Sequence, residues 1–139
     1  MKYKKTNLGY VVRLFRGEEV MSSLVEIAER ENILSGFVVG LGAVSEVKLG
    51  YYELETKEYH SQMFNEDYEM GNLTGNFAQV DGNTFLHAHI TITDKDCKAF
   101  AGHLFSAKIY ATGEFFIYTF DKAIERKLDE EIGLKLLDL

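Results

Sequence analysis

The sequence is poor in cysteine, proline and basic residues, and it has no long apolar run. Among its 139 residues there is no proline and a single cysteine, Cys97, which excludes an internal disulfide and suits a reducing cytoplasm. The longest apolar stretch, residues 33–44, is interrupted by glycines and is too short to span a bilayer. Residues 8–15 contain Arg13 and lack the small-residue cleavage site of a secretory signal. We therefore expect a cytoplasmic protein without a membrane segment.

The chain also has fewer basic residues than acidic ones. The 15 lysines and arginines face 22 acidic residues, so the formal net charge is −7. Such a charge repels a phosphate backbone, whereas nucleic-acid-binding domains usually carry a basic face. The one tight basic cluster, Lys2 to Lys5, fits a solvated terminus better than a DNA-binding arm, and the Arg-Gly-Arg core of an AT-hook is missing. The composition therefore argues against duplex DNA as the main partner.

The sequence does have enough apolar residues for one folded domain. Hydrophobic residues make up 46% of the chain and include eight tyrosines and ten phenylalanines, which excludes a disordered protein. A chain of this length can bury a substantial core. We expect residues 1–139 to form a single domain.

The hydrophobic pattern predicts one helix, then many strands. Gly17-Glu18-Glu19 begins the expected helix, with both acids in its first turn, and the helix ends near Asn32. Its core face is formed by apolar residues at helical spacing, namely Val20, Leu24, Ile27 and Ala28. The expected strands are residues 8–16, 33–41, 44–54, 59–64, 67–80, 84–93, 98–105 and 108–120. A bend or bulge is expected at Gly40 and Gly42.

The C-terminal pattern predicts a second, short helix. Ile124, Leu128 and Ile132 recur every four residues within the charged segment 121–132, and Gly133 is suited to ending a helix. Residues 134–139 then form a short strand or tail. The predicted fold class is α+β: a mostly antiparallel β-sheet with one packed N-terminal helix and a short C-terminal helix.

Three of the four histidines are predicted to meet on this sheet. In a strand, His87 and His89 share one face, while Leu86, Ala88, Ile90 and Ile92 form an apolar opposite face. A turn at residues 94–96 returns the next strand, so His103 comes back beside them. Three neutral imidazoles form the ligand set of an open zinc site. The alternative is that these are ordinary half-buried strand histidines, because an H-x-H pair alone is a weak signal. His60 lies among polar residues and is assigned no role.

Five short motifs occur in an order that resembles the PPC domain, the plant and prokaryote conserved domain. They are residues 42–44 (GAV), 69–75 (EMGNLTG), 87–89 (HAH), 101–104 (AGHL) and 111–114 (ATGE). The resemblance extends from about Gly9 to about Leu137. Ala101 replaces the first glycine of the family's G-G-H-L motif, and Gly71 and Asn72 interrupt the apolar run that usually follows Glu69.

The resemblance implies an antiparallel sheet with the helix packed on it, and a homotrimer. It also raises DNA association, because the domain follows AT-hooks in plant nuclear proteins. Glu69 and Glu114 occupy motif positions from which either could act as a general base or hold a ligand histidine, although exposed strand glutamates are the simpler interpretation. No serine or cysteine nucleophile with a positioned base is evident.

Three hypotheses therefore stand. The first is a divalent-metal protein, with zinc the expected ion, that acts on or senses a small polar molecule through His87, His89 and His103. The second is a DNA-binding protein, and the third is an interaction scaffold with structural histidines. Whether the protein is an enzyme is left open. In the first case, metal affinity should fall as pH drops through the ordinary histidine range near 6.

Overall fold

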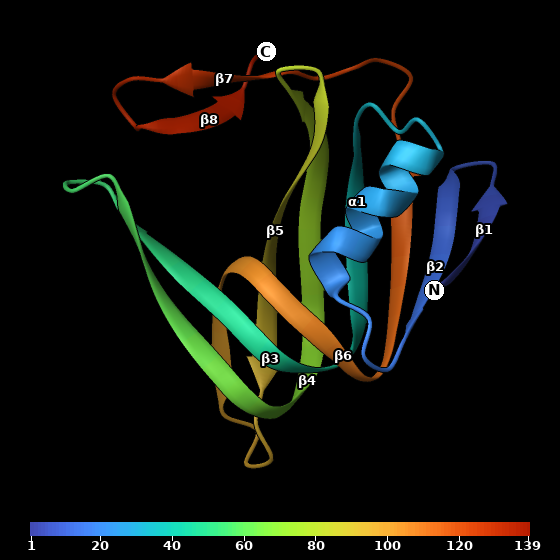
Figure 1. Ribbon diagram of the computed structural model, residues 1–139, viewed down its shortest axis with the longest axis vertical. Coiled ribbons are helices and arrows are strands. Elements are labelled where there is room, and N and C mark those ends of the chain that lie inside the picture. Colours follow the sequence, from blue (N-terminus) through green and yellow to red (C-terminus); the bar gives the residue numbers. More distant parts are fainter.

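The computed structural model describes all 139 residues and contains one helix and eight strands (Figure 1). In chain order the elements are β1 (Lys2–Thr6), β2 (Gly9–Phe15), α1 (Val20–Arg30), β3 (Gly36–Glu53), β4 (Glu58–Val80), β5 (Asn83–Thr93), β6 (Ala99–Thr119), β7 (Arg126–Asp129) and β8 (Leu134–Leu137). The helix is neither long enough nor apolar enough to cross a membrane. The predicted α+β class with a mostly antiparallel sheet is confirmed.

The main sheet closes on itself at one end. Its six strands are hydrogen-bonded in the order β1-β2-β6-β3-β4-β5, and β5 also pairs with β6. The first half of β6 pairs with β5 and β3, and its second half pairs with β3 and β2. Strands β3, β4, β5 and β6 thus form a closed ring, which removes the exposed edge that β5 would otherwise present. This closure places the start of β6 beside the end of β5.

Glycines allow the long strands to bend. The two strands expected at residues 33–41 and 44–54 are one strand, β3, with a register shift between Gly40 and Gly42. Gly42 has a φ of +153°, and a side chain there would collide with the carbonyl oxygen of Thr112. The predicted bulge is therefore confirmed, and the backbone explains why glycine is needed. Another shift lies between Met70 and Asn72, where the sequence departs from the family pattern.

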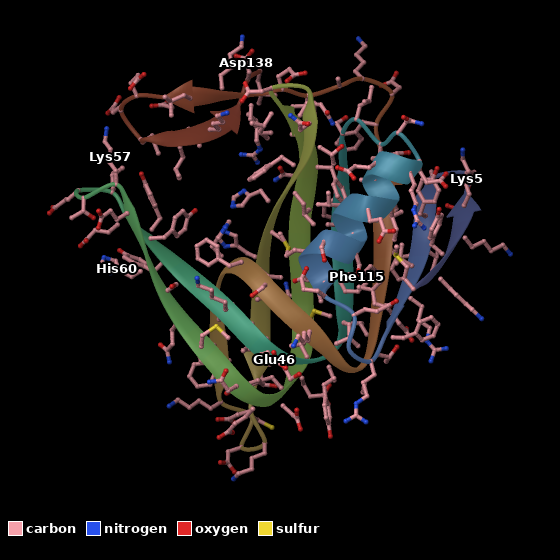
Figure 2. All side chains as sticks on the ribbon, in the orientation of Figure 1. Lys5, Glu46, Lys57, His60, Phe115 and Asp138 are labelled. Carbon is pink, nitrogen blue, oxygen red and sulfur yellow. The ribbon has the colours of Figure 1, made fainter.

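The helix covers the buried face of the sheet (Figure 1). Its buried residues are the four that the spacing predicted: Val20, Leu24, Ile27 and Ala28. They belong to the same core as Phe115, which is fully buried on β6 (Figure 2). The expected placement of both acids in the first turn was wrong. Glu19 is the N-cap, accepting hydrogen bonds from the Met21 and Ser22 amides, and Glu18 precedes the helix.

The C-terminal helix was a wrong prediction, because residues 126–137 form the hairpin β7–β8. The backbone amide of Gln79 donates to the carbonyl of Ile124, which joins the start of this segment to β4. At its turn, the Tyr52 hydroxyl donates to the Ile132 carbonyl at 2.6 Å. A short isolated helix is only marginally stable in water, so these contacts with the main sheet decide the conformation. Figure 1 shows the hairpin crossing one end of the sheet.

The N-terminal lysines also differ from expectation, because they lie on a strand. Lys2, Lys4 and Lys5 are on β1, which pairs with β2 at the open edge of the sheet. Their side chains are exposed, and Figure 2 shows Lys5 at this side of the molecule. Lysines on an edge strand discourage pairing with the edges of other sheets.

Candidate metal centre

The strand pairing brings three histidines together as the sequence predicted. His87 and His89 lie on one face of β5, while Leu86, Ala88, Ile90 and Ile92 on its other face are buried. His103 on β6 is the direct register partner of His89. This neighbourhood exists because β5 and β6 pair at the closure of the ring.

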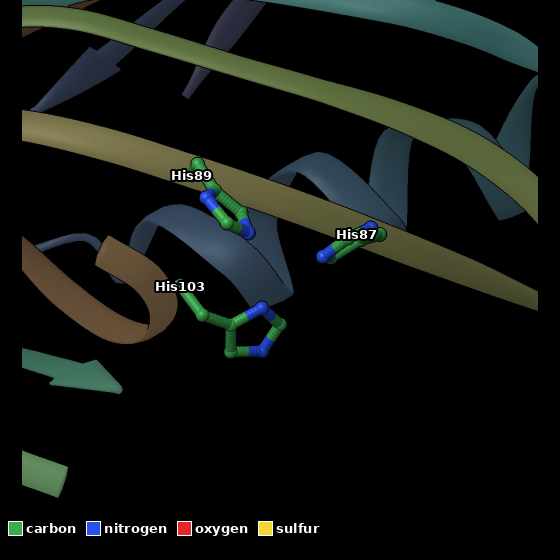
Figure 3. A group of neighbouring side chains, drawn as sticks. All are labelled: His87, His89 and His103. Atoms are coloured by element: carbon green, nitrogen blue, oxygen red, sulfur yellow. The ribbon is translucent and has the colours of Figure 1, made fainter. Parts of the chain in front are cut away.

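The three imidazoles converge on one space (Figure 3). The His87 ring centroid lies 5.1 Å from each of the other two, and the His89 and His103 centroids are 5.6 Å apart. One nitrogen from each ring lies within 4.8 Å of the others, so the three could hold a metal ion. This spread is wider than a metal with bonds of about 2.0–2.1 Å requires. Small rotations of the side chains would be enough to close the group around an ion.

The environment keeps two of the rings neutral. Burial is the main cause that lowers the pKa of His87 to about 4, helped by the neighbouring His103, Arg126 and His89. Burial also lowers the pKa of His103, with a smaller contribution from His89. A neutral imidazole has a lone pair to offer a metal, and a protonated one does not. Both rings are therefore available as ligands at neutral pH without first losing a proton.

His103 has a nitrogen that no protein group satisfies. Its Nδ1 is buried and makes no hydrogen bond. Buried polar atoms nearly always have a partner, so an orphaned one needs an explanation. In Figure 3 the His103 ring presents a nitrogen-bearing edge to His87 and His89. A metal ion in the shared space is a group that this donor set would fit.

Sequence reasoning missed a second group beside the histidines. Arg126, at the start of β7, is buried, and its Nη2 donates to Asn76 Oδ1 at 2.7 Å. The same Nη2 lies 3.5 Å from His87 Nδ1, which is too long for a strong hydrogen bond. A metal bound at Nε2 requires the neutral ring to carry its proton on Nδ1. The guanidinium, which only donates, makes no hydrogen bond to that tautomer, in keeping with the long contact. No local signal could have found this contact, because Arg126 stood within the segment expected to be helical.

A cavity of about 480 Å³ opens beside two of the three histidines, His87 and His103. His87, His103 and Arg126 contribute to its wall, and most of the rest is apolar or aromatic. The rings of Tyr59 and Phe105 each lie 4.9 Å from the His103 ring. Cavities of this size with few polar groups are typical of small-molecule sites.

The other candidate residues lie elsewhere. Glu69 is the register partner of Thr93 on β5, and Glu114 is that of Arg13 on β2, so neither lines the cavity or joins the histidine group. Both are exposed strand glutamates, which is the simpler of the two interpretations of these residues. His60 lies on β4 near the turn between β3 and β4 (Figure 2), and its Nε2 lies 2.9 Å from Glu53 Oε2. As expected, it is exposed and outside the site.

Comparison with known families gives a match over most of the chain. The sequence pattern of the Plants and Prokaryotes Conserved (PCC) domain, also called PPC, matches residues 1–121. The chain belongs to the PPC family. No curated protein matches this PPC chain.

Solved structures share the PPC fold over nearly their whole length. A Bacteroides thetaiotaomicron protein, described provisionally as DNA-binding, has a TM-score of 0.96 and 35% identity, covering 99% of this chain and 96% of its own. A metal-containing protein from Archaeoglobus fulgidus has a TM-score of 0.87 and 33% identity, with 100% of both chains covered. A Pyrococcus horikoshii PPC protein has a TM-score of 0.88 and 28% identity, covering 99% and 95%.

Proposed function

We propose that this PPC protein binds one divalent metal ion, with zinc the best fit, through His87, His89 and His103. In this proposal the metal keeps an open coordination position and serves to act on, or to sense, a small polar molecule. The observation that carries the proposal is the unsatisfied, buried Nδ1 of His103 within a group of converging imidazoles. The metal-containing relative from Archaeoglobus fulgidus supports it.

The donor set narrows the choice of metal. Three imidazoles suit zinc, copper, nickel or iron, and they disfavour magnesium and calcium, which prefer oxygen ligands. Zinc bound by three protein ligands typically leaves one position for water or substrate. Because neutral histidines add no negative charge, such an ion would lower the pKa of a bound water or polarise a carbonyl.

The chain's own residues would orient and shelter the ligand. The aromatic wall formed by Tyr59 and Phe105 limits the access of water to the His103 side of the site. Asn76 and the Lys135 carbonyl fix the guanidinium of Arg126 next to His87. No carboxylate belongs to the histidine group or lines the cavity, so a general base for catalysis would have to come from the ligand or from water.

Metal analysis of purified variants tests the proposal. We expect the wild-type protein, equilibrated with zinc and then desalted, to retain about one ion per chain, as a single three-ligand site requires. His87→Ala should retain far less, because two ligands remain, while His60→Ala is the matched control and should retain the wild-type amount. Equal zinc in the wild type and in His87→Ala would contradict the proposal.

We further propose that the protein is a homotrimer. The sheet face opposite α1 carries apolar side chains from neighbouring strands. Val11 and Phe116 are register partners, as are Phe37 and Tyr118, whose rings stack at 5.6 Å. Phe116 is 47% exposed and Tyr118 is 38% exposed in the single chain. Apolar surface of this kind is typical of subunit interfaces, and the PPC resemblance supplies the expectation of three subunits.

DNA binding is the second candidate function. It is favoured by the relative from Bacteroides thetaiotaomicron that is described provisionally as DNA-binding. The net charge of −7 opposes it, and the exposed lysines of β1 form the one basic cluster that could contact phosphates. We place the metal function first and the protein in the cytoplasm, which suits its single cysteine.

A further inference from the structure

Arg126 is a buried cation without an acidic partner. The residue is only 8% exposed, and none of the protein's ion pairs includes it. Its two short hydrogen bonds go to neutral oxygens, the Lys135 carbonyl at 2.8 Å and Asn76 Oδ1 at 2.7 Å. A buried charge is costly unless it is paired. The positive charge of Arg126 is therefore uncompensated by the folded chain.

The guanidinium of Arg126 also has N–H groups that no short hydrogen bond uses. Arginine carries five N–H groups, and the two short hydrogen bonds use two of them. The Nε–H is buried and has no partner. Burial lowers the pKa of Arg126, yet arginine stays protonated in proteins. The protein supplies neither a counter-charge nor enough acceptors for this guanidinium. An anion would do both, because it neutralises the charge and accepts hydrogen bonds.

The cavity next to the histidines is large enough to hold such an anion beside Arg126. Arg126 lines it together with His87 and His103, and no acidic side chain does. The guanidinium lies 5.4 Å from the centroid of the Phe85 ring, and Leu136 adds apolar wall nearby. The other cation of the lining, Lys135, already pairs with Asp81 at 2.5 Å. The free positive charge of the cavity is therefore that of Arg126.

We propose that this cavity binds an organic monocarboxylate with an apolar body, the carboxylate meeting Arg126 and the body lying against Phe85 and Leu136. One guanidinium in mostly apolar walls suits a single carboxylate better than a phosphate dianion, which calls for more donors. The inference deepens the proposed function by naming the class of molecule that reaches the metal site. Only that link to the metal rests on the proposed function, because the carboxylate site itself needs no metal.

Hexanoate and the uncharged, similarly shaped hexanamide test the proposal by calorimetry and by amide NMR. Both are titrated into zinc-loaded protein and into protein freed of metal by a chelator. We expect hexanoate to bind about tenfold or more tightly than hexanamide in both forms, because hydrogen bonds to charged groups are the strong ones. Its chemical-shift changes should fall on Phe85, Leu136 and their neighbours.

Arg126→Met keeps the buried stem without the charge and should erase the preference for hexanoate. Arg30→Met is the matched control, since Arg30 is exposed on α1 and pairs with Glu26, and it should keep the preference. Equal binding of hexanoate and hexanamide by the metal-free wild type would overturn the proposal, whether or not the variant folds. So would a preference that survives in Arg126→Met, or tighter binding of inorganic phosphate than of hexanoate.

The same titrations separate this proposal from the metal function. A hexanoate preference that persists without metal supports the Arg126 site even if zinc analysis fails. Zinc retained by the histidines, with a carboxylate preference seen only in zinc-loaded protein, would place the carboxylate on the metal and overturn the Arg126 site alone.

Discussion

At the scale of single residues, the histidines show how burial changes the behaviour of a strand motif. The alternation of β5 was enough to pair His87 with His89, and the turn after it was enough to predict His103. What the sequence could not show was how far the rings are buried. Because the pKa of His87 is lowered to about 4, the sequence-based expectation that protons displace the metal near pH 6 needs revision for this ligand. Its competition with protons begins at lower pH.

The lowered pKa predicts how stability depends on pH in the metal-free protein. The folded state holds His87 neutral down to a pKa of about 4, whereas the unfolded chain has the ordinary value of 6.5. Between these values the unfolded state binds more protons, so acid destabilises the fold. The full shift corresponds to about 2 kcal/mol lost at pH 5 relative to neutral pH, and because the ring is only half-buried, solvent screening makes the expected loss smaller than this.

Urea unfolding of metal-free wild type and His87→Phe at pH 7 and pH 5 measures this effect. This window lies above the range in which most carboxylates titrate. The variant should lose less stability on acidification than the wild type, while His60→Phe, which removes an exposed histidine paired with Glu53, should lose at least as much. An equal loss in the wild type and in His87→Phe would show that the folded state does not hold His87 neutral.

At the scale of elements, the sequence predicted what local patterns determine. The buried face of α1 was predicted residue by residue, because the apolar residues that recur at helical spacing are also the ones that are buried. Strand bounds were less accurate, because β3, β4 and β6 continue through glycine bulges that interrupt the apolar pattern. The hairpin β7–β8 was missed for a different reason: its conformation depends on contacts with Tyr52 and Gln79, which are distant in sequence. Arg126 and the cavity were missed with it.

Removing a contact that anchors this hairpin should lower the protection of its amides against hydrogen exchange. Tyr52→Phe removes the hydrogen bond to the Ile132 carbonyl, worth about 1 kcal/mol. Amide hydrogen exchange in residues 126–137 should become several-fold faster, because local opening costs less. Tyr51→Phe is the matched control, since that neighbouring tyrosine is 71% exposed. Unchanged exchange in Tyr52→Phe would show that the hairpin is held elsewhere.

At the scale of the whole molecule, the apolar sheet face predicts association. Light scattering at micromolar concentration should give three times the chain mass of 15.8 kDa. Phe116→Asp, at the centre of the face, should shift the protein toward smaller species, because a charge in an apolar interface is costly. Tyr51→Asp, on another exposed aromatic, is the control and should leave the mass unchanged. A wild-type monomer mass would contradict the trimer.

The overall charge predicts weak contact with DNA. At about 150 mM salt, non-specific binding of proteins to duplex DNA usually lies between about 10⁻⁴ and 10⁻⁶ M. With a net charge of −7, we expect binding no tighter than this range by fluorescence anisotropy. A sub-micromolar dissociation constant would instead favour the DNA-binding function. Lys4→Glu would then show whether β1 makes the contact.

The most direct measurement of the central claim is a crystal structure of zinc-soaked protein with anomalous data across the zinc edge. We expect one peak among His87, His89 and His103, about 2.0–2.1 Å from a nitrogen of each ring. Partial occupancy would still support the claim, because it is the position that identifies the ligands. A peak held by other residues would contradict it. So would three imidazoles that point apart, with nitrogens more than about 5 Å from any common point, over twice the expected bond length.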